Sequence, residues 1–229
     1  MKIPYFLKKL LQWMILCLFP VTTLAQGFTD IQLPPPQTDG GRPLMQVLND
    51  RKSTRDFRPD ELPIQTLSNL LWAGFGVNRP DGRRTAPSAS NKQEIDIYVA
   101  TAEGLYVYDA KVNRLHALLP KDVRAETGIQ AFVGTAPLDL VYVADLAKTG
   151  ADSAERDMDV AADAGFISEN VYLFCASERL ATVVRGSIDR AALSKAMKLR
   201  ANQRIILAQT VGFHPHRSAQ IAIGARCPP

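Results

Sequence analysis

Two arginines and a serine alternate in the segment Arg51-Lys52-Ser53-Thr54-Arg55. In an extended chain alternate side chains point to the same side, so Arg51, Ser53 and Arg55 would share one face. Two guanidinium groups and a hydroxyl on one face suit a phosphate or a polyhydroxyl chain, because Arg offers paired, planar donors to an oxyanion. A solvated helix end explains the same residues, and composition alone favours that simpler interpretation.

A second polar cluster comes directly before an alternating apolar stretch. Pro87-Ser88-Ala89-Ser90-Asn91 is rich in residues that favour turns, and both Asn91 and Gln93 carry amides. An amide donates and accepts hydrogen bonds at once, which suits a flat heterocycle with carbonyl oxygens and ring nitrogens. An ordinary loop is the alternative interpretation of this cluster.

A third cluster ends a strand-like run with a glycine. Thr182-Val183-Val184-Arg185-Gly186 alternates as a strand does, and Gly186 follows at its end. A glycine there lets a ligand approach the backbone closely. Taken alone this is a weak signal.

The elements that must position these clusters alternate between helical and strand patterns. Apolar residues at helical spacing predict helices over residues 43–51, 62–76, 162–181 and 188–199, the last capped by Asp189. Alternation or continuous apolar runs predict strands over residues 94–101, 104–118 (a hairpin turning near 109–114), 137–145, 181–186 and 204–212. The mixture predicts an α+β fold in one domain, with the helix 162–181 buried on more than one face.

The first 25 residues have the features of a secretory signal peptide. Lys2, Lys8 and Lys9 precede an apolar run from Leu10 to Pro20, and small residues end at Ala25. An uncleaved membrane anchor is the alternative, but the apolar core of about a dozen residues is shorter than the roughly 20 that a spanning helix needs. We therefore expect a signal peptide (1–25), an extended lead-in rich in Pro and Gly that lies outside the core (26–43) and a single domain (44–229). The mature protein would be exported to the periplasm, without a stable membrane anchor.

Charge and cysteine content exclude several kinds of partner. Without its signal peptide the chain has 24 basic and 23 acidic residues, and it lacks a basic stripe with interleaved aromatics, so we expect no nucleic-acid partner. Cys175 and Cys227 remain, and the sequence leaves a disulfide between them open. No metal is expected, because neither cysteine has a ligand at metal spacing and His214 with His216 makes a poor site.

The order and spacing of the three polar clusters resemble the FMN-dependent nitroreductase family. The resemblance covers nearly all of residues 44–216 and is carried by RKSTR, the P-S-x-x-N-x-Q segment, the GFISENVYL helix, LATVVRG and ILAQTVGFHP. The stretch LLWAGFGVNRPDGRRTAPSA is also similar to the branch that includes the oxidases of thiazole-forming systems. The SNKQE that follows is closer to the general nitroreductase form.

This resemblance implies a set of cofactor-binding residues. Those expected to contact the FMN phosphate and ribityl chain are Arg51, Ser53 and Arg55, with Arg217 after the last strand as a further phosphate contact. Those expected to reach the flavin from the other subunit are Pro87, Ser88, Ser90 and Asn91. The backbone of Val184, Arg185 and Gly186 is expected to lie over the flavin ring, and the role of the Arg185 side chain is left open.

The resemblance also implies a fold and an activity. The fold would be a nitroreductase-like α/β sandwich, with a mixed, mainly antiparallel sheet flanked by helices, in an intertwined homodimer. The activity would be two-step hydride transfer through FMN from a small-molecule donor to an acceptor such as a nitroaromatic or a quinone, with no catalytic side chain assigned. An exported enzyme would not meet NAD(P)H, so the donor is left open. The alternatives are a non-enzymatic flavin or small-molecule binding protein, or a flavin-dependent oxidase or dehydrogenase of a specific metabolite.

Overall fold

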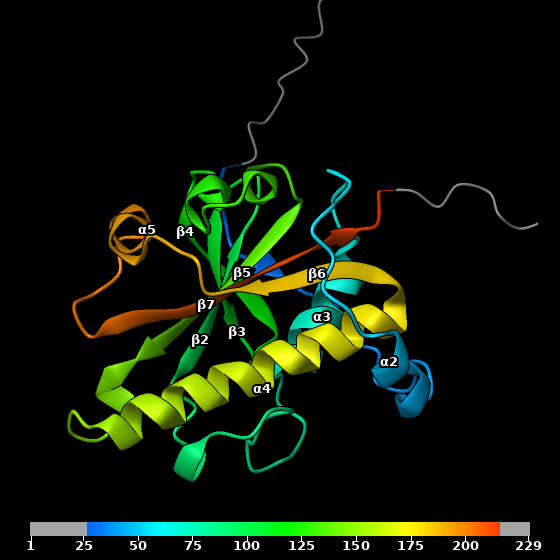
Figure 1. Cartoon of the computed structure of the whole chain (residues 1–229). Helices are drawn as coiled ribbons and strands as arrows, with labels where there is room; N and C mark the ends of the chain where they lie inside the picture. Colours follow the sequence, from blue (N-terminus) through cyan, green and yellow to red (C-terminus); the bar gives the residue numbers. More distant parts are fainter. Residues whose placement is uncertain (1–26, 216–229) are drawn as a thin grey trace, which may run out of the picture.

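Seven strands form one sheet in the order β1-β4-β3-β2-β5-β7-β6 (Figure 1). The computed structural model describes residues 27–215, so the signal peptide, Arg217 and Cys227 lie outside the described residues. The strands are β1 (Ile31–Gln32), β2 (Ile95–Ala100), β3 (Leu105–Asp109), β4 (Arg114–Leu119), β5 (Leu138–Asp145), β6 (Leu180–Arg185) and β7 (Gln203–Phe213). Within residues 27–215 the paired strands are all antiparallel, so the expected mainly antiparallel sheet is confirmed and contains no parallel pair there.

The central strand β5 is buried along its whole length. It pairs with β2 on one side and with β7 on the other, and helices cover both faces of the sheet around it. A strand in that position needs a continuous apolar run, because neither of its faces meets water. The run PLDLVYVAD therefore forms the buried strand that its sequence predicts.

Helices cover both faces of the sheet, as expected for an α+β sandwich. The helices are α2 (Leu44–Asp50), α3 (Ile64–Phe75), α4 (Ala154–Glu178) and α5 (Arg190–Ala196). On one face α3 and α4 pack together, with Leu70 and Ile167 among their buried residues, while Leu193 of α5 belongs to the core on the other face. Figure 1 shows α4 running along the sheet with α2 beside its C-terminal end. No helix within the described part of the chain is long and apolar enough to cross a membrane.

Helix α4 differs at both ends from the predicted range of 162–181. It begins at Ala154, where the Ser153 side chain accepts a hydrogen bond from the Arg156 N–H, and it ends at Glu178. Its first two turns are polar, so apolar periodicity alone does not reveal them; the capping serine and the acidic first turn do. Arg179 then adopts a left-handed conformation, and Leu180 already belongs to β6.

The lead-in segment is extended, but the expectation that it lies outside the core is wrong. Ile31 and Gln32 pair with β4, and Leu33 is only 2% exposed. The Pro34 carbonyl accepts hydrogen bonds from the Ser68 hydroxyl and the Asn113 amide. A two-residue strand is too short to show alternation, which is why the sequence pattern does not indicate it.

Candidate functional site

The segment 51–55 lies along the outer edge of β6. Helix α2 ends at Asp50, and the backbone of Arg51 is extended, with φ −58° and ψ 123°. The Thr54 N–H then donates to the Thr182 carbonyl of β6 at 2.8 Å. The segment is therefore extended, as the alternation predicts, and only Arg51 belongs to a helix end.

A tyrosine of α4 brings three of the predicted groups together. The Tyr172 hydroxyl lies 2.7 Å from the Ser53 hydroxyl and accepts a hydrogen bond from the Val184 N–H at 2.9 Å. The Arg51 guanidinium lies 5.2 Å from the centre of the Tyr172 ring, within the range of a cation–π contact. Tyr172 is not among the site residues expected from the sequence, because it sits in the apolar run NVYLF of a helix expected to be buried on more than one face. The one signal was a hydroxyl on an otherwise apolar helix face.

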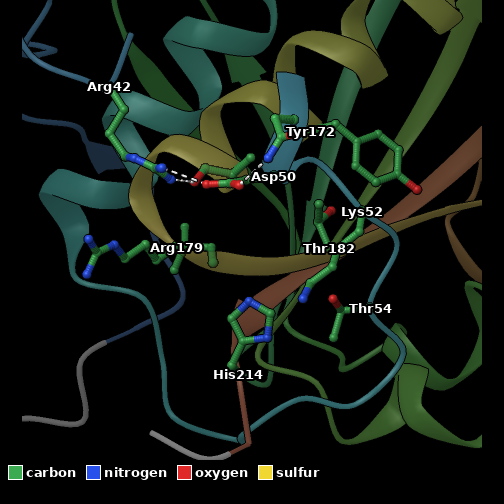
Figure 2. Close-up of a pocket in the computed structure, with 11 residues that line it drawn as sticks. Arg42, Asp50, Lys52, Thr54, Tyr172, Arg179, Thr182 and His214 are labelled. Atoms are coloured by element: carbon green, nitrogen blue, oxygen red, sulfur yellow. Dashed lines mark hydrogen bonds and ion pairs between the residues drawn. The ribbon is translucent and has the colours of Figure 1, made fainter. Parts of the chain in front are cut away.

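The other side chains of this segment line a pocket. Lys52 and Thr54 border a cavity of about 450 Å³ between α2, α4 and β6 (Figure 2). The remaining lining residues are Arg42, Asn49, Asp50, Tyr172, Ala176, Arg179, Leu180, Thr182 and His214. Alternation thus separates two faces, since Arg51 and Ser53 contact Tyr172 while Lys52 and Thr54 border the pocket. Arg55 is exposed at the end of the segment.

The pocket carries a positive charge. Arg42, Lys52 and Arg179 are its cationic lining residues, and its one lining carboxylate, Asp50, pairs with Arg42 at 2.6 Å. The Arg42 guanidinium lowers the pKa of Asp50, so this carboxylate stays ionised. Burial and the charge of Lys52 lower the pKa of His214, which leaves its imidazole neutral at pH 7. An anionic ligand group is the chemistry that such a lining favours.

At the end of β6 the Arg185 side chain turns into the core. Its guanidinium donates to the Thr127 carbonyl at 2.7 Å, to the Asp139 carboxylate at 2.6 Å and to the Thr210 hydroxyl at 2.9 Å. Complete burial raises the pKa of Asp139, and the charge of Arg185 opposes this shift. The Arg185 side chain is therefore structural.

Gly186 leaves room beside the end of β6. A side-chain carbon at this position would meet only Leu207, at 3.9 Å, so packing within the described chain does not require a glycine. Gly186 is also exposed. Close approach of a ligand to the backbone is possible on this side.

The loop 87–93 is held in a strained conformation. Ser90, Asn91 and Gln93 have positive φ values of 52°, 54° and 48°, which are uncommon for residues other than glycine. The Ser88 hydroxyl accepts from the Gln93 N–H at 3.0 Å, and the Asn91 amide oxygen accepts from the Gln93 side chain at 3.0 Å. Backbone strain that the surroundings maintain in this way often marks a functional loop.

This loop and the segment 51–55 contact different parts of α4. The Ala89 N–H donates to the Asp163 carboxylate at 2.8 Å, whereas Ser53 contacts Tyr172, which comes nine residues later. At 1.5 Å per residue these contacts are roughly 13 Å apart along the helix. Within a single chain, Arg51, Ser53 and Val184 therefore lie together around Tyr172. Ser88, Ser90 and Asn91 form a separate cluster.

A pair of carboxyl groups is buried beneath this loop. Glu94 is 1% exposed and Asp163 is 3% exposed, and neither Glu94 oxygen has a hydrogen-bond partner among the described residues. Burial first, and then the neighbouring Asp163, raise the pKa of Glu94 to about 7. Glu94 is therefore partly protonated near neutral pH.

Metal-binding side chains are not clustered in the part of the chain from 27 to 215. No group of three or more His, Cys, Asp or Glu residues there could hold a metal ion. Cys175 is fully buried in α4 as a core residue.

Comparison with known proteins identifies the family. The model of the nitroreductase family matches residues 48–213, which is most of the chain. This chain belongs to the nitroreductase family. Membership identifies an oxidoreductase in general terms, and it confirms the family expected from the three polar clusters.

Relatives of this nitroreductase-family chain agree in both sequence and fold. A protein assigned as a nitroreductase from Ralstonia eutropha has a crystal structure with 45% identity and a TM-score of 0.78, covering 82% of this chain and 90% of that one. A protein assigned as a nitroreductase from Methanocaldococcus jannaschii is 29% identical over 168 residues, 69% of this chain and 85% of its own. The NADPH:FMN oxidoreductase from Vibrio harveyi, complexed with NAD⁺, is 20% identical with a TM-score of 0.59, covering 81% of this chain and 73% of that one. At 20% identity, the similarity to the Vibrio harveyi enzyme shows a shared fold alone.

Proposed function

We propose that this chain is an FMN-dependent oxidoreductase that takes hydride from a small-molecule donor and passes it to an acceptor such as a nitroaromatic or a quinone. Family membership supports the reaction class. The observation that carries the proposal is the grouping of Arg51, Ser53 and the end of β6 around Tyr172, beside a cationic pocket. Cationic and hydroxyl donors suit the phosphate of FMN, and an exposed strand end next to them leaves room for its flat ring.

In this proposal each part of FMN has its own set of contacts. Arg51, Ser53 and Arg55 would hold the phosphate and ribityl chain, and Arg217 is proposed as a further phosphate contact. Because the Val184 N–H already donates to Tyr172 and Arg185 pairs with Ala208 of β7, backbone contacts to the flavin ring would fall to Gly186. The room beside Gly186 is consistent with a ring lying against this strand end.

The residues of this chain bind and orient, while the flavin supplies the redox chemistry. When bound, FMN would supply hydride transfer between the donor and the acceptor. With the signal peptide proposed to direct export to the periplasm, a donor other than NAD(P)H is required.

We expect wild-type protein to bind FMN, and Arg51→Ala and Arg55→Ala each to weaken that binding about tenfold or more. Each variant would lose a charge-assisted contact to phosphate of about 1.5 to 3 kcal/mol. The measurement is titration of FMN into apoprotein, followed by flavin absorbance. Reoxidation of the reduced, FMN-loaded wild type by a quinone then separates an enzyme from a binding protein.

Two lysine variants serve as comparisons in this FMN titration. Lys121 is exposed and pairs only with Glu126 across a surface loop, so Lys121→Ala is the matched control and should leave FMN affinity unchanged. Lys52 borders the pocket on the opposite face of the segment, so Lys52→Ala reports whether the phosphate lies there instead. Equal affinities for Arg51→Ala, Arg55→Ala and wild type would remove the phosphate role from Arg51 and Arg55.

We further propose that two chains share each FMN site in a homodimer. The loop with Ser88, Ser90 and Asn91 lies too far along α4 to reach the Arg51 cluster of its own chain. In helix α2 only Val47 is buried, whereas Leu44 and Leu48 are exposed. Large apolar side chains exposed on α2 and α4 offer the contact surface: Leu44, Met45, Leu48, Met158 and Phe166.

Complementation between subunits tests the shared site. Light scattering of the wild type is expected to give the mass of a dimer. A mixed dimer of one Arg51→Ala/Arg55→Ala chain and one Asn91→Ala chain is expected to keep one intact FMN site, whereas each parent dimer has none. A flavin-loaded monomer, or mixed dimers that bind no better than their parents, would contradict the shared site.

A further inference from the structure

Tyr172 makes two hydrogen bonds whose directions follow from the chemistry of the partners. The Val184 N–H can only donate, so the phenol oxygen accepts it at 2.9 Å. Tyr172 is 5% exposed, and a buried phenol hydrogen without an acceptor would cost about 1 to 3 kcal/mol. The Ser53 oxygen, 2.7 Å away, is the acceptor that the structure provides. The phenol therefore donates to Ser53.

This arrangement leaves Ser53 with a hydroxyl hydrogen to donate. A serine hydroxyl that accepts from Tyr172 turns its own hydrogen away from the phenol. On the same phenol ring the Arg51 guanidinium is held by a cation–π contact at 5.2 Å. One side chain thus positions two donors, Ser53 through its hydroxyl and Arg51 through its ring.

We propose that Tyr172 is a positioning residue that makes the segment 51–55 select flavin carrying a phosphate over flavin without one. Because the Tyr172 phenol donates to Ser53, the Ser53 hydroxyl is left to act as a donor toward a ligand. A phosphate needs donors, because its oxygens only accept hydrogen bonds. The ribityl hydroxyls of riboflavin both donate and accept, so they gain less from a fixed donor. This inference rests on the proposed function and adds to it the residue that sets cofactor selectivity.

The test compares FMN with riboflavin in the wild type and four variants. Tyr172→Phe keeps the ring that holds Arg51 and removes only the hydroxyl. FMN affinity is expected to fall about tenfold in this variant and riboflavin affinity less than about twofold, because one oriented donor to phosphate is lost. Ser53→Ala should show the same selective loss, and the double variant should lose little more than either single one, because both act through one contact. Tyr108→Phe is the matched control, since the hydroxyl of this other buried tyrosine bonds Asn113 in the hairpin.

The outcomes separate this inference from the proposed function. Equal losses for FMN and riboflavin, or losses that add in the double variant, would mean that Tyr172 only supports the fold. Wild-type protein that binds neither flavin would overturn the proposed function and this inference with it. If Tyr172→Phe does not fold, Ser53→Ala decides alone, because an unchanged ratio of FMN to riboflavin affinity would overturn the inference.

Discussion

Replacing Arg185 with methionine is expected to lower the free energy of unfolding by about 3 to 5 kcal/mol. The substitution keeps much of the side-chain volume but leaves the Asp139 carboxylate, which is 0% exposed, without its guanidinium partner at 2.6 Å. The guanidinium also bonds Thr127 and Thr210, so their acceptors lose a donor as well. Urea unfolding of wild type and variant measures the difference.

Two further variants show whether the loss comes from an uncompensated buried charge. Arg185→Met combined with Asp139→Leu should recover most of the stability, because replacing both partners of a buried pair with apolar side chains is often neutral. Arg83→Met breaks a pair with Asp81 in which both side chains are about half exposed, and it should cost about 0.5 kcal/mol or less. A loss below about 1 kcal/mol in Arg185→Met would contradict the structural role of this arginine.

The free energy of unfolding is expected to fall as the pH rises from 4.5 to about 7, and Glu94→Gln should remove up to about 3 kcal/mol of that fall. The Glu94 pKa is raised from 4.5 to about 7 in the folded chain, chiefly by burial and then by Asp163, while Lys92 opposes the shift. Over this range the folded protein retains a proton that the unfolded chain has released. The contribution of Glu94 is therefore complete below pH 4.5 and is lost as the pH passes through about 7.

Glutamine tests this because it resembles the protonated acid and does not titrate. Unfolding is measured at several pH values, and the quantity of interest is the difference in slope between wild type and variant, since other carboxyl groups titrate in both. Glu169→Gln is the matched control, because Glu169 is exposed on the same helix as Asp163. Identical slopes for Glu94→Gln and wild type would show that Glu94 holds no proton in the folded chain near pH 7.

Much of the fold was predictable because the burial of one face of a helix or strand requires apolar residues at a regular spacing in the sequence. The run of β5, the hairpin of β3 and β4, and the apolar stripe of α3 are each dictated by which faces meet water. Two parts of the fold were not predicted: the polar turns at the start of α4 and the two residues of β1. Neither forms a periodic apolar pattern. Their positions depend on a cap and on a partner strand far along the chain.

The candidate site was predictable only in part, for a different reason. Alternation alone indicated that Arg51 and Ser53 share a face, and the structure confirms that both meet Tyr172. The role of Tyr172 could not be derived, because its contacts come from two segments far from it in sequence. The role of the Arg185 side chain could not be derived for the same reason, because its carboxylate partner Asp139 lies on another strand.

The segment 51–55 also protects the sheet from self-association. Strand β6 is an edge strand, and the Thr54 N–H covers the carbonyl of Thr182 on its open side. At the opposite edge, β1 has only two residues and offers little template for another chain. If Arg51 and Ser53 hold FMN as proposed, loss of FMN would loosen this cover and expose backbone groups that pair readily with a neighbouring molecule. Flavin loading and resistance to aggregation would then be coupled through the same five residues.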